Sequence, residues 1–276
     1  MNGTERGDFS EIPKLDVSAL YGTDEAAIAA TAAEMRGHLE TTGFLYVVGH
    51  PITTGQIEAV RAMGKRFFAL SEDEKAKIQI DKNFRGYLKF AGSTIVTSSV
   101  EQVSKPNQSE SIFFMHEVAE DDPRAIAGLP LQGPNQWPDA EVLPGFRETI
   151  EAYVEAMTVL GRKMASAIAI SLGLPADSLN RYFEDPTTFL RLLHYPPQPP
   201  EDGLFGSAPH TDYGFITLLA QDDVGGLEVL NKNGDWVAAP PVPGAFVMNV
   251  GDILARWSND LFVSTPHRVI NSSGRE

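Results

Sequence analysis

Two histidines and one aspartate have the residue types and the spacing of a metal site. His210 and Asp212 are two positions apart, and side chains at positions i and i+2 of an extended strand point to the same face. His267 stands at the start of another run of β-forming residues. Because the chain contains no cysteine, imidazole and carboxylate groups must hold any metal. The pattern predicts an ion bound by His210, Asp212 and His267.

This set of donors indicates a particular chemistry. Two imidazoles and one carboxylate on one face of an ion are typical of non-haem iron(II) sites, where open positions admit co-substrate and dioxygen. The spacing alone leaves one alternative open, in which a buried histidine bonds to a backbone carbonyl and no metal binds. The contexts of His38, His50 and His116 indicate structural or solvated side chains. Strand alternation predicts that His194 and Tyr195 point to opposite faces.

The composition bounds the partners and the location of the protein. Of 276 residues, 42% are hydrophobic and 21% charged, which is typical of a globular protein with a sizeable core. The net charge of −15 comes without a basic stripe, so we expect neither nucleic acid nor a membrane surface as partner. Residues 1–13 lack a signal-peptide pattern, and no apolar run approaches the ~18 residues that cross a bilayer. We expect a cytoplasmic protein, and its oligomeric state is not indicated.

The elements that must position these residues change character along the chain. Apolar residues at helical spacing predict helices over 25–40, 54–70 and 151–172, whereas 85–108 and 123–144 have the composition of loops. Short β-type runs then alternate with turn residues, at 189–195, 214–220, 226–230, 246–250 and 267–270. We predict a mainly β fold with flanking α-helices. A helix-rich region over 1–150 and a long helix with a β barrel or sandwich over 151–276 form one shared structural unit.

Ordered motifs over most of the chain resemble one family. The N-terminal half contains Ile12 to Asp16 (Ile-Pro-x-Leu-Asp), Gly43 to His50, and Arg85-Gly86-Tyr87. The C-terminal half contains Tyr195-Pro196-Pro197, His210-Thr211-Asp212, Asp222 to Val229, Gly234 to Val237, Asn249 to Asp252, Trp257-Ser258-Asn259 and Ser264 to Val269. In this order, the motifs resemble those of the 2-oxoglutarate/iron(II)-dependent dioxygenases of the isopenicillin N synthase type. The resemblance implies a double-stranded β-helix (jelly-roll) core flanked by helices.

The resemblance also implies an activity. His210, Asp212 and His267 match the positions that bind iron(II) in the family. Most members use 2-oxoglutarate and dioxygen to hydroxylate, desaturate or cyclise a small molecule, and they release succinate and carbon dioxide. Tyr195 corresponds to the tyrosine that hydrogen-bonds the distal carboxylate of 2-oxoglutarate. The expected cofactors are therefore Fe(II), 2-oxoglutarate and O2.

Two departures from the family pattern concern the co-substrate. Leu193 stands where many plant members have an asparagine that contacts 2-oxoglutarate. Members that use 2-oxoglutarate also carry an Arg-x-Ser motif beyond the second histidine, and its arginine binds the distal carboxylate. The sequence ends at Glu276 before such a motif is complete. We expect the C-terminal end of the jelly roll to be incomplete and the motif to lie beyond Glu276, with Arg275 as the alternative anchor.

The substrate is the least determined feature. Arg85, Tyr87 and Phe114 are candidate substrate contacts, and each is equally a candidate packing or loop-anchoring residue. Arg191 falls where related bacterial enzymes place a polar residue near co-substrate or substrate, and it hints at a small molecule that bears a carboxylate. Its alternative is a strand residue paired with a surface carboxylate. Two rival functions stay open: an iron-dependent oxidase that does not use 2-oxoglutarate, and a non-catalytic jelly-roll binding protein.

Overall fold

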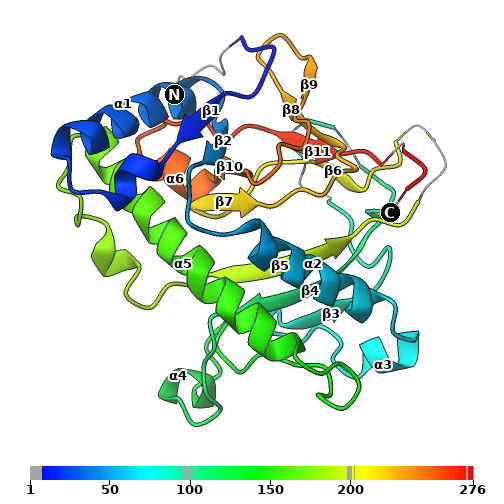
Figure 1. The fold of residues 1–276 in the computed structure, drawn as a ribbon. Coiled ribbons are helices and arrows are strands. Elements are labelled where there is room, and N and C mark those ends of the chain that lie inside the picture. Colours follow the sequence, from blue (N-terminus) through cyan, green and yellow to red (C-terminus); the bar gives the residue numbers. More distant parts are fainter. Residues whose placement is uncertain are drawn as a thin grey trace.

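The strands of the computed structural model form three sheets (Figure 1). The structure describes residues 8–95, 98, 100–101, 103–197, 201, 203–271 and 273–275. The first sheet has the order β1 (Lys14–Asp16), β2 (Phe44–Val48), β10 (Phe246–Val250) and β7 (Ile216–Leu219). The second sheet has the order β6 (Ser207–His210), β11 (His267–Val269), β8 (Leu227–Leu230) and β9 (Trp236–Ala238). The third sheet has the order β3 (Gly86–Leu88), β4 (Glu110–Met115) and β5 (Phe189–His194).

The first and second sheets share an apolar layer. Phe44 and Val247 of the first sheet pack in one cluster with Leu227 and Val229 of the second. Among the named strands, only β1 and β2 pair in parallel, and the other described pairs are antiparallel. Residues alternate between the faces of β10, so Met248 points away from this layer into the larger core against the helices. The result is the β sandwich that the sequence predicts.

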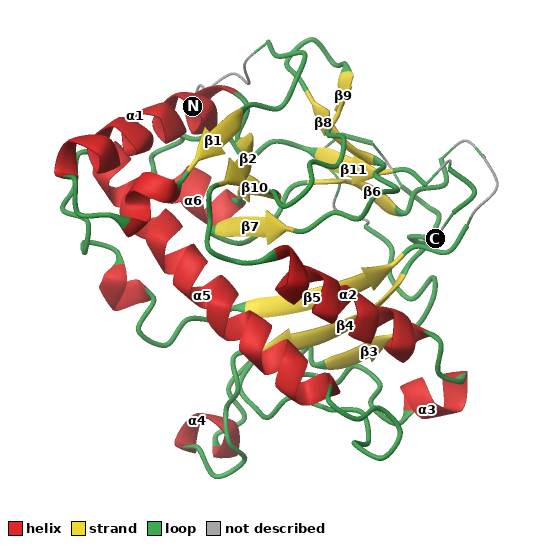
Figure 2. Ribbon diagram, viewed as in Figure 1, coloured by secondary structure: helices red, strands yellow, loops and turns green. Residues whose placement is uncertain are grey.

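Helices pack on the other face of the first sheet and on one face of the third, as Figure 2 shows. The helices are α1 (Glu25–Thr41), α2 (Thr54–Phe68), α3 (Glu72–Ala76), α4 (Pro123–Ile126), α5 (Phe146–Ser171) and α6 (Asp252–Trp257), with 3-10 turns η1 (Ser18–Tyr21) and η2 (Asn180–Tyr182). The larger apolar core joins α1, α2 and α5 to the first and third sheets, through residues such as Met35, Phe67, Phe146, Leu45 and Ile112. Within the described ranges, no helix has the length and apolar character needed to cross a bilayer.

Three elements differ from the sequence prediction. α5 begins at Phe146 rather than at residue 151, because Phe146 and Ile150 are both buried and extend its apolar face by a turn. The stretch expected as a loop contains α4, which begins at Pro123 and whose first turn is capped by the carboxylate of Asp122. α6 was not predicted, since its six residues are too short to show a helical apolar period.

Candidate functional site

The second sheet brings the three predicted ligands together. His210 is the last residue of β6 and pairs directly with His267, the first residue of β11. Nε2 of His210 lies 3.6 Å from Oδ1 of Asp212, and Nε2 of His267 lies 3.7 Å from the same oxygen. Asp212 lies just beyond the end of β6, not within a strand. In this loop its backbone carbonyl accepts a 2.7 Å hydrogen bond from the amide of Asp252. One ligand atom from each residue lies within 4.8 Å of the other two.

Both histidine rings are held in the orientation that a metal requires. Nδ1 of His210 lies 2.7 Å from the carbonyl of Ala208, and Nδ1 of His267 lies 3.2 Å from the carbonyl of Thr265. Because a carbonyl only accepts, each Nδ1 carries the proton and donates it, which leaves the lone pair on Nε2 free to bind a metal. The carbonyl bonds of the alternative interpretation are therefore present, but they occupy only one nitrogen of each ring.

The aspartate is prepared in a similar way. Oδ2 of Asp212 accepts hydrogen bonds from the hydroxyl of Thr217 on β7 and from Nδ2 of Asn249 on β10, the latter at 2.8 Å. Burial raises the pKa of Asp212, but the charge of His267 and the bonds from Thr217 and Asn249 outweigh it, so the pKa lies below its usual value. The carboxylate is thus ionised, and Oδ1 is turned toward the two imidazoles.

The state of His267 also suits a metal. Burial and the neighbouring charge of His210 lower the pKa of His267 to about 4, so the ring is neutral at physiological pH, the form that coordinates metals. Two imidazole nitrogens and one carboxylate oxygen are the donors of a facial site for iron(II). The residues present therefore fit the ion that the sequence predicts.

Strand β5 carries the two other polar residues of interest, Arg191 and Tyr195 just beyond its end. The guanidinium of Arg191 lies over the ring of its cross-strand neighbour Phe113, 4.6 Å from the ring centroid. Burial lowers the pKa of Arg191, while the charges of Tyr195 and Asp212 act in the opposite direction. Burial raises the pKa of Tyr195 to about 12, against the effect of the Arg191 charge. Arg191 and Tyr195 thus lie on the side of the third sheet that faces the ligand cluster.

The structure does not bring Tyr87 and Phe114 to the cluster. Phe114 is buried in the main core and stacks on Trp137, with 4.6 Å between ring centroids. Tyr87 is also buried there, and its hydroxyl donates to the carboxylate of Glu110. The physical reason is strand alternation: Phe113 faces the cluster side, so its neighbour Phe114 faces the helices. The packing alternative therefore describes both residues.

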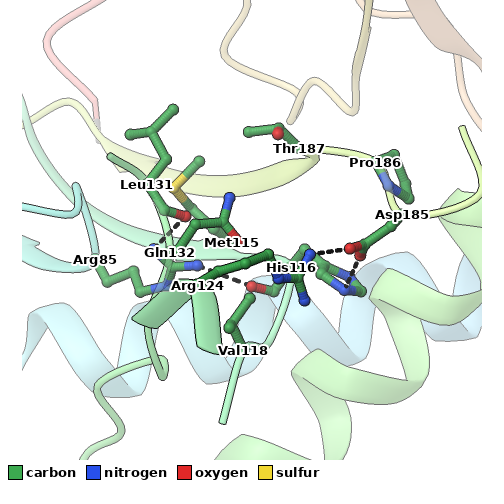
Figure 3. Close-up of a pocket in the computed structure, with 10 residues that line it drawn as sticks. All are labelled: Arg85, Met115, His116, Val118, Arg124, Leu131, Gln132, Asp185, Pro186 and Thr187. Atoms are coloured by element: carbon green, nitrogen blue, oxygen red, sulfur yellow. Dashed lines mark hydrogen bonds and ion pairs between the residues drawn. The ribbon is translucent and has the colours of Figure 1, made fainter. Parts of the chain in front are cut away.

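Arg85 is a loop anchor. Its side chain is buried and donates hydrogen bonds to the carbonyls of Asn83, Leu131 and His116. Figure 3 shows it at a cavity of about 10 Å³, also lined by Arg124 and Asp185. A cavity of that size accommodates one water molecule and is too small for a substrate. The loop-anchoring alternative thus describes Arg85.

Arg275 is on the surface. Its guanidinium pairs with the exposed carboxylate of Asp223, at 3.2 Å, and its side chain is 59% exposed. The structure does not bring this arginine to the ligand cluster, so the alternative anchor for 2-oxoglutarate gains no support.

Sequence reasoning missed three residues of the site: Thr217, Asn249 and Phe113. Asn249 could have been found, because it is a buried amide in the otherwise apolar strand Phe246–Val250, and buried polar groups are hydrogen-bonded. Phe113 could have been chosen over Phe114 once β4 and β5 were aligned. Thr217 carries no such signal, since threonine is common in strands.

Comparisons with known proteins agree with this geometry. The profile of the 2OG-Fe(II) oxygenase superfamily matches residues 179–276. The profile described as non-haem dioxygenase in morphine synthesis N-terminal matches residues 12–140. The chain is 38% identical over 273 residues to a 2-oxoglutarate-Fe(II) type oxidoreductase of Emericella nidulans, covering 96% of this chain and 76% of the relative.

Solved structures give the same answer. A full-length Neurospora crassa protein, crystallised in complex with α-ketoglutarate (2-oxoglutarate) and thymine, superposes with a TM-score of 0.82 at 31% identity, covering 100% of this chain and 84% of that one. JOX2, in complex with 2-oxoglutarate, iron and JA (jasmonate), superposes with a TM-score of 0.74 at 26% identity, covering 99% of this chain and 74% of JOX2. The β sandwich is therefore the double-stranded β-helix that the sequence motifs imply. This chain belongs to the 2-oxoglutarate/iron(II)-dependent oxygenases, and it is an oxidoreductase that uses iron(II), 2-oxoglutarate and dioxygen on a small-molecule substrate.

Proposed function

We propose that the enzyme hydroxylates a small molecule bearing a carboxylate. In this proposal His210, Asp212 and His267 bind the iron, Tyr195 contacts 2-oxoglutarate, and Arg191 binds the substrate carboxylate. Jasmonate, the ligand of one structural relative, is itself a carboxylate, whereas thymine, the ligand of another, is not. The comparisons thus allow this substrate class, and Arg191 is the argument for it.

The observation that carries the proposal is a buried nitrogen of Arg191 that donates no hydrogen bond. Nε of Arg191 is buried and has no hydrogen-bond partner within the described residues. A buried N–H donor without a partner is unfavourable, and a carboxylate that accepts two parallel hydrogen bonds from the guanidinium satisfies it. No carboxylate of the described residues lies within ion-pair distance of this side chain, which favours a ligand contact over a surface ion pair. Its charge interacts instead with Asp212, the proposed iron ligand.

The protein's contribution to the reaction is binding and orientation. Bound iron(II), with 2-oxoglutarate and dioxygen, supplies the oxidising chemistry, and 2-oxoglutarate leaves as succinate and carbon dioxide. The carbonyls of Ala208 and Thr265 hold the imidazole rings, and Thr217 and Asn249 hold the carboxylate. Arg191 then places the substrate at a fixed distance from the metal, so that one carbon is presented for oxidation.

Steady-state kinetics test the role of Arg191. Succinate release is measured with iron(II), 2-oxoglutarate and a panel of small organic acids, for the wild type and for Arg191→Gln. We expect the KM of an accepted acid to rise at least tenfold in Arg191→Gln, because a charged hydrogen-bond partner is lost. The co-substrate KM, measured through decarboxylation of 2-oxoglutarate without substrate, should change less than twofold. A rise confined to the co-substrate KM would show that Arg191 serves 2-oxoglutarate and contradict the proposal.

A further inference from the structure

Arg191 is part of an aromatic surface that the proposed function does not use. Phe189, Arg191 and Leu193 alternate along β5 on the side of the cluster, opposite Met115, Phe113 and Ser111 of β4. The ring of Phe113 lies beneath the guanidinium of Arg191 and contacts Phe189, with 6.4 Å between ring centroids. Phe189 is 62% exposed. A guanidinium that fits a carboxylate therefore lies beside two phenyl rings, which we call the Phe113–Phe189 pair.

The charges on this side of the third sheet are as informative as the rings. The described residues that share the face with Arg191 along β4 and β5 are apolar or uncharged: Met115, Phe113, Ser111, Phe189 and Leu193. The carboxylate of Glu110 points to the opposite face, where it binds Lys75 and His194. The acidic group that acts on Arg191 is Asp212, whose oxygens are used by the proposed metal and by Thr217 and Asn249. An ammonium group on a ligand would therefore lie beside the Arg191 guanidinium with no carboxylate to pair with it, and the repulsion between the two positive charges is unfavourable.

We propose that the substrate is an aromatic monocarboxylate without a positive charge, with its carboxylate on Arg191 and its ring against the Phe113–Phe189 pair. The inference rests on the proposed function, because it takes the role of Arg191 from there. It adds the chemical class of the rest of the molecule. Aromatic rings pack on phenylalanine edge-to-face or offset, and such pairs contribute beyond their buried area.

Binding can be measured without turnover. The full chain is loaded with Mn(II) in place of iron(II) and with 2-oxoglutarate, without oxygen, and titrated in a calorimeter. The probes are 3-phenylpropionate, its amide, hexanoate and L-phenylalanine, which vary the carboxylate, the ring and the ammonium group separately. The variants are Phe113→Leu and Phe189→Ala. Because Phe189 is exposed, the second variant keeps the test valid if the first fails to fold, and Phe84→Ala removes another exposed ring as a control.

We expect 3-phenylpropionate to bind at least tenfold more tightly than its amide and than L-phenylalanine. Phe113→Leu and Phe189→Ala should each weaken the binding of 3-phenylpropionate about three- to tenfold and leave the binding of hexanoate unchanged. The control Phe84→Ala should change neither. Equal affinity for hexanoate and 3-phenylpropionate, unaffected by the variants, would overturn the contact with the Phe113–Phe189 pair and leave the carboxylate anchor intact. Equal affinity for the acid and its amide would overturn the anchor itself. Tight binding of L-phenylalanine, or no binding of 3-phenylpropionate, would also overturn the inference.

Discussion

Replacing Thr217 by valine should weaken metal binding without changing any proposed ligand. The Thr217 hydroxyl donates to Oδ2 of Asp212 and, with Asn249, fixes the carboxylate so that Oδ1 faces the imidazoles. Valine has the same shape and keeps the β-branch of β7, so the loss is confined to one hydrogen bond to a charged acceptor. Such a bond contributes about 1.5–3 kcal/mol, and about 1.4 kcal/mol corresponds to a tenfold change in affinity. We therefore expect Thr217→Val to bind the metal about 10- to 100-fold more weakly, the range found for groups that orient metal ligands.

Anaerobic calorimetric titration with Mn(II) measures this directly. Thr217→Ser is the matched control, because it keeps the hydroxyl and loses only a methyl group, and its affinity should stay within about threefold of the wild type. Asn249 remains in place in both variants, so each carboxylate keeps one donor. If Thr217→Val binds Mn(II) within twofold of the wild type, the hydroxyl does not position Asp212 for the metal, and the reasoning fails.

Three other contacts give further predictions. Glu110→Gln removes the buried one of the two carboxylates that Lys75 binds, at 2.8 Å, and leaves only the exposed Glu72, so urea unfolding should show a loss of about 1–3 kcal/mol. Burial raises the pKa of Glu110, but hydrogen bonds from its neighbours outweigh burial and lower the pKa from 4.5 to about 2. The ionised Glu110 therefore stabilises the folded protein fully above pH 4.5, and this contribution is lost as the pH falls toward 2. An equal deficit near pH 3 and at neutral pH would therefore contradict the assignment. Tyr195→Phe should raise the co-substrate KM about tenfold, and an unchanged value would remove Tyr195 from contact with 2-oxoglutarate. Arg275→Gln should leave the co-substrate KM within twofold, because the partner of Arg275 is the exposed Asp223; a large rise would show that this arginine reaches the co-substrate.

The parts of the fold that repeat a regular pattern could be predicted from the sequence. The strand predicted over 246–250 is β10 (Phe246–Val250), and the helix predicted over 25–40 is α1 (Glu25–Thr41), because each has a continuous apolar pattern and a clear stop. Strands of three residues, such as β3 and β9, are too short to show a period. Their positions depend on pairing with neighbouring strands, which the local sequence does not encode.

In the site, too, the features encoded by local sequence could be predicted, and those that depend on strand pairing could not. His210, Asp212 and His267 could be chosen from residue type and motif order, although Asp212 reaches the cluster from a loop and not from the strand face first expected. The substrate side could not be chosen in this way, because it depends on which face of β4 and β5 turns toward the metal. A shift of one residue exchanges Phe113 for Phe114. Of the two other residues given a candidate role in binding, Arg85 anchors a loop and Tyr87 packs in the core.

The central claim is that His210, Asp212 and His267 bind the iron, and anaerobic equilibrium dialysis against iron(II) followed by metal analysis tests it most directly. We predict one iron per chain for the wild type and for the control His116→Ala, whose histidine pairs with Asp185 away from the cluster. His267→Ala and Asp212→Ala should retain the fold by circular dichroism and lose the bound iron. One equivalent of iron retained with unchanged affinity by folded His267→Ala would contradict the account.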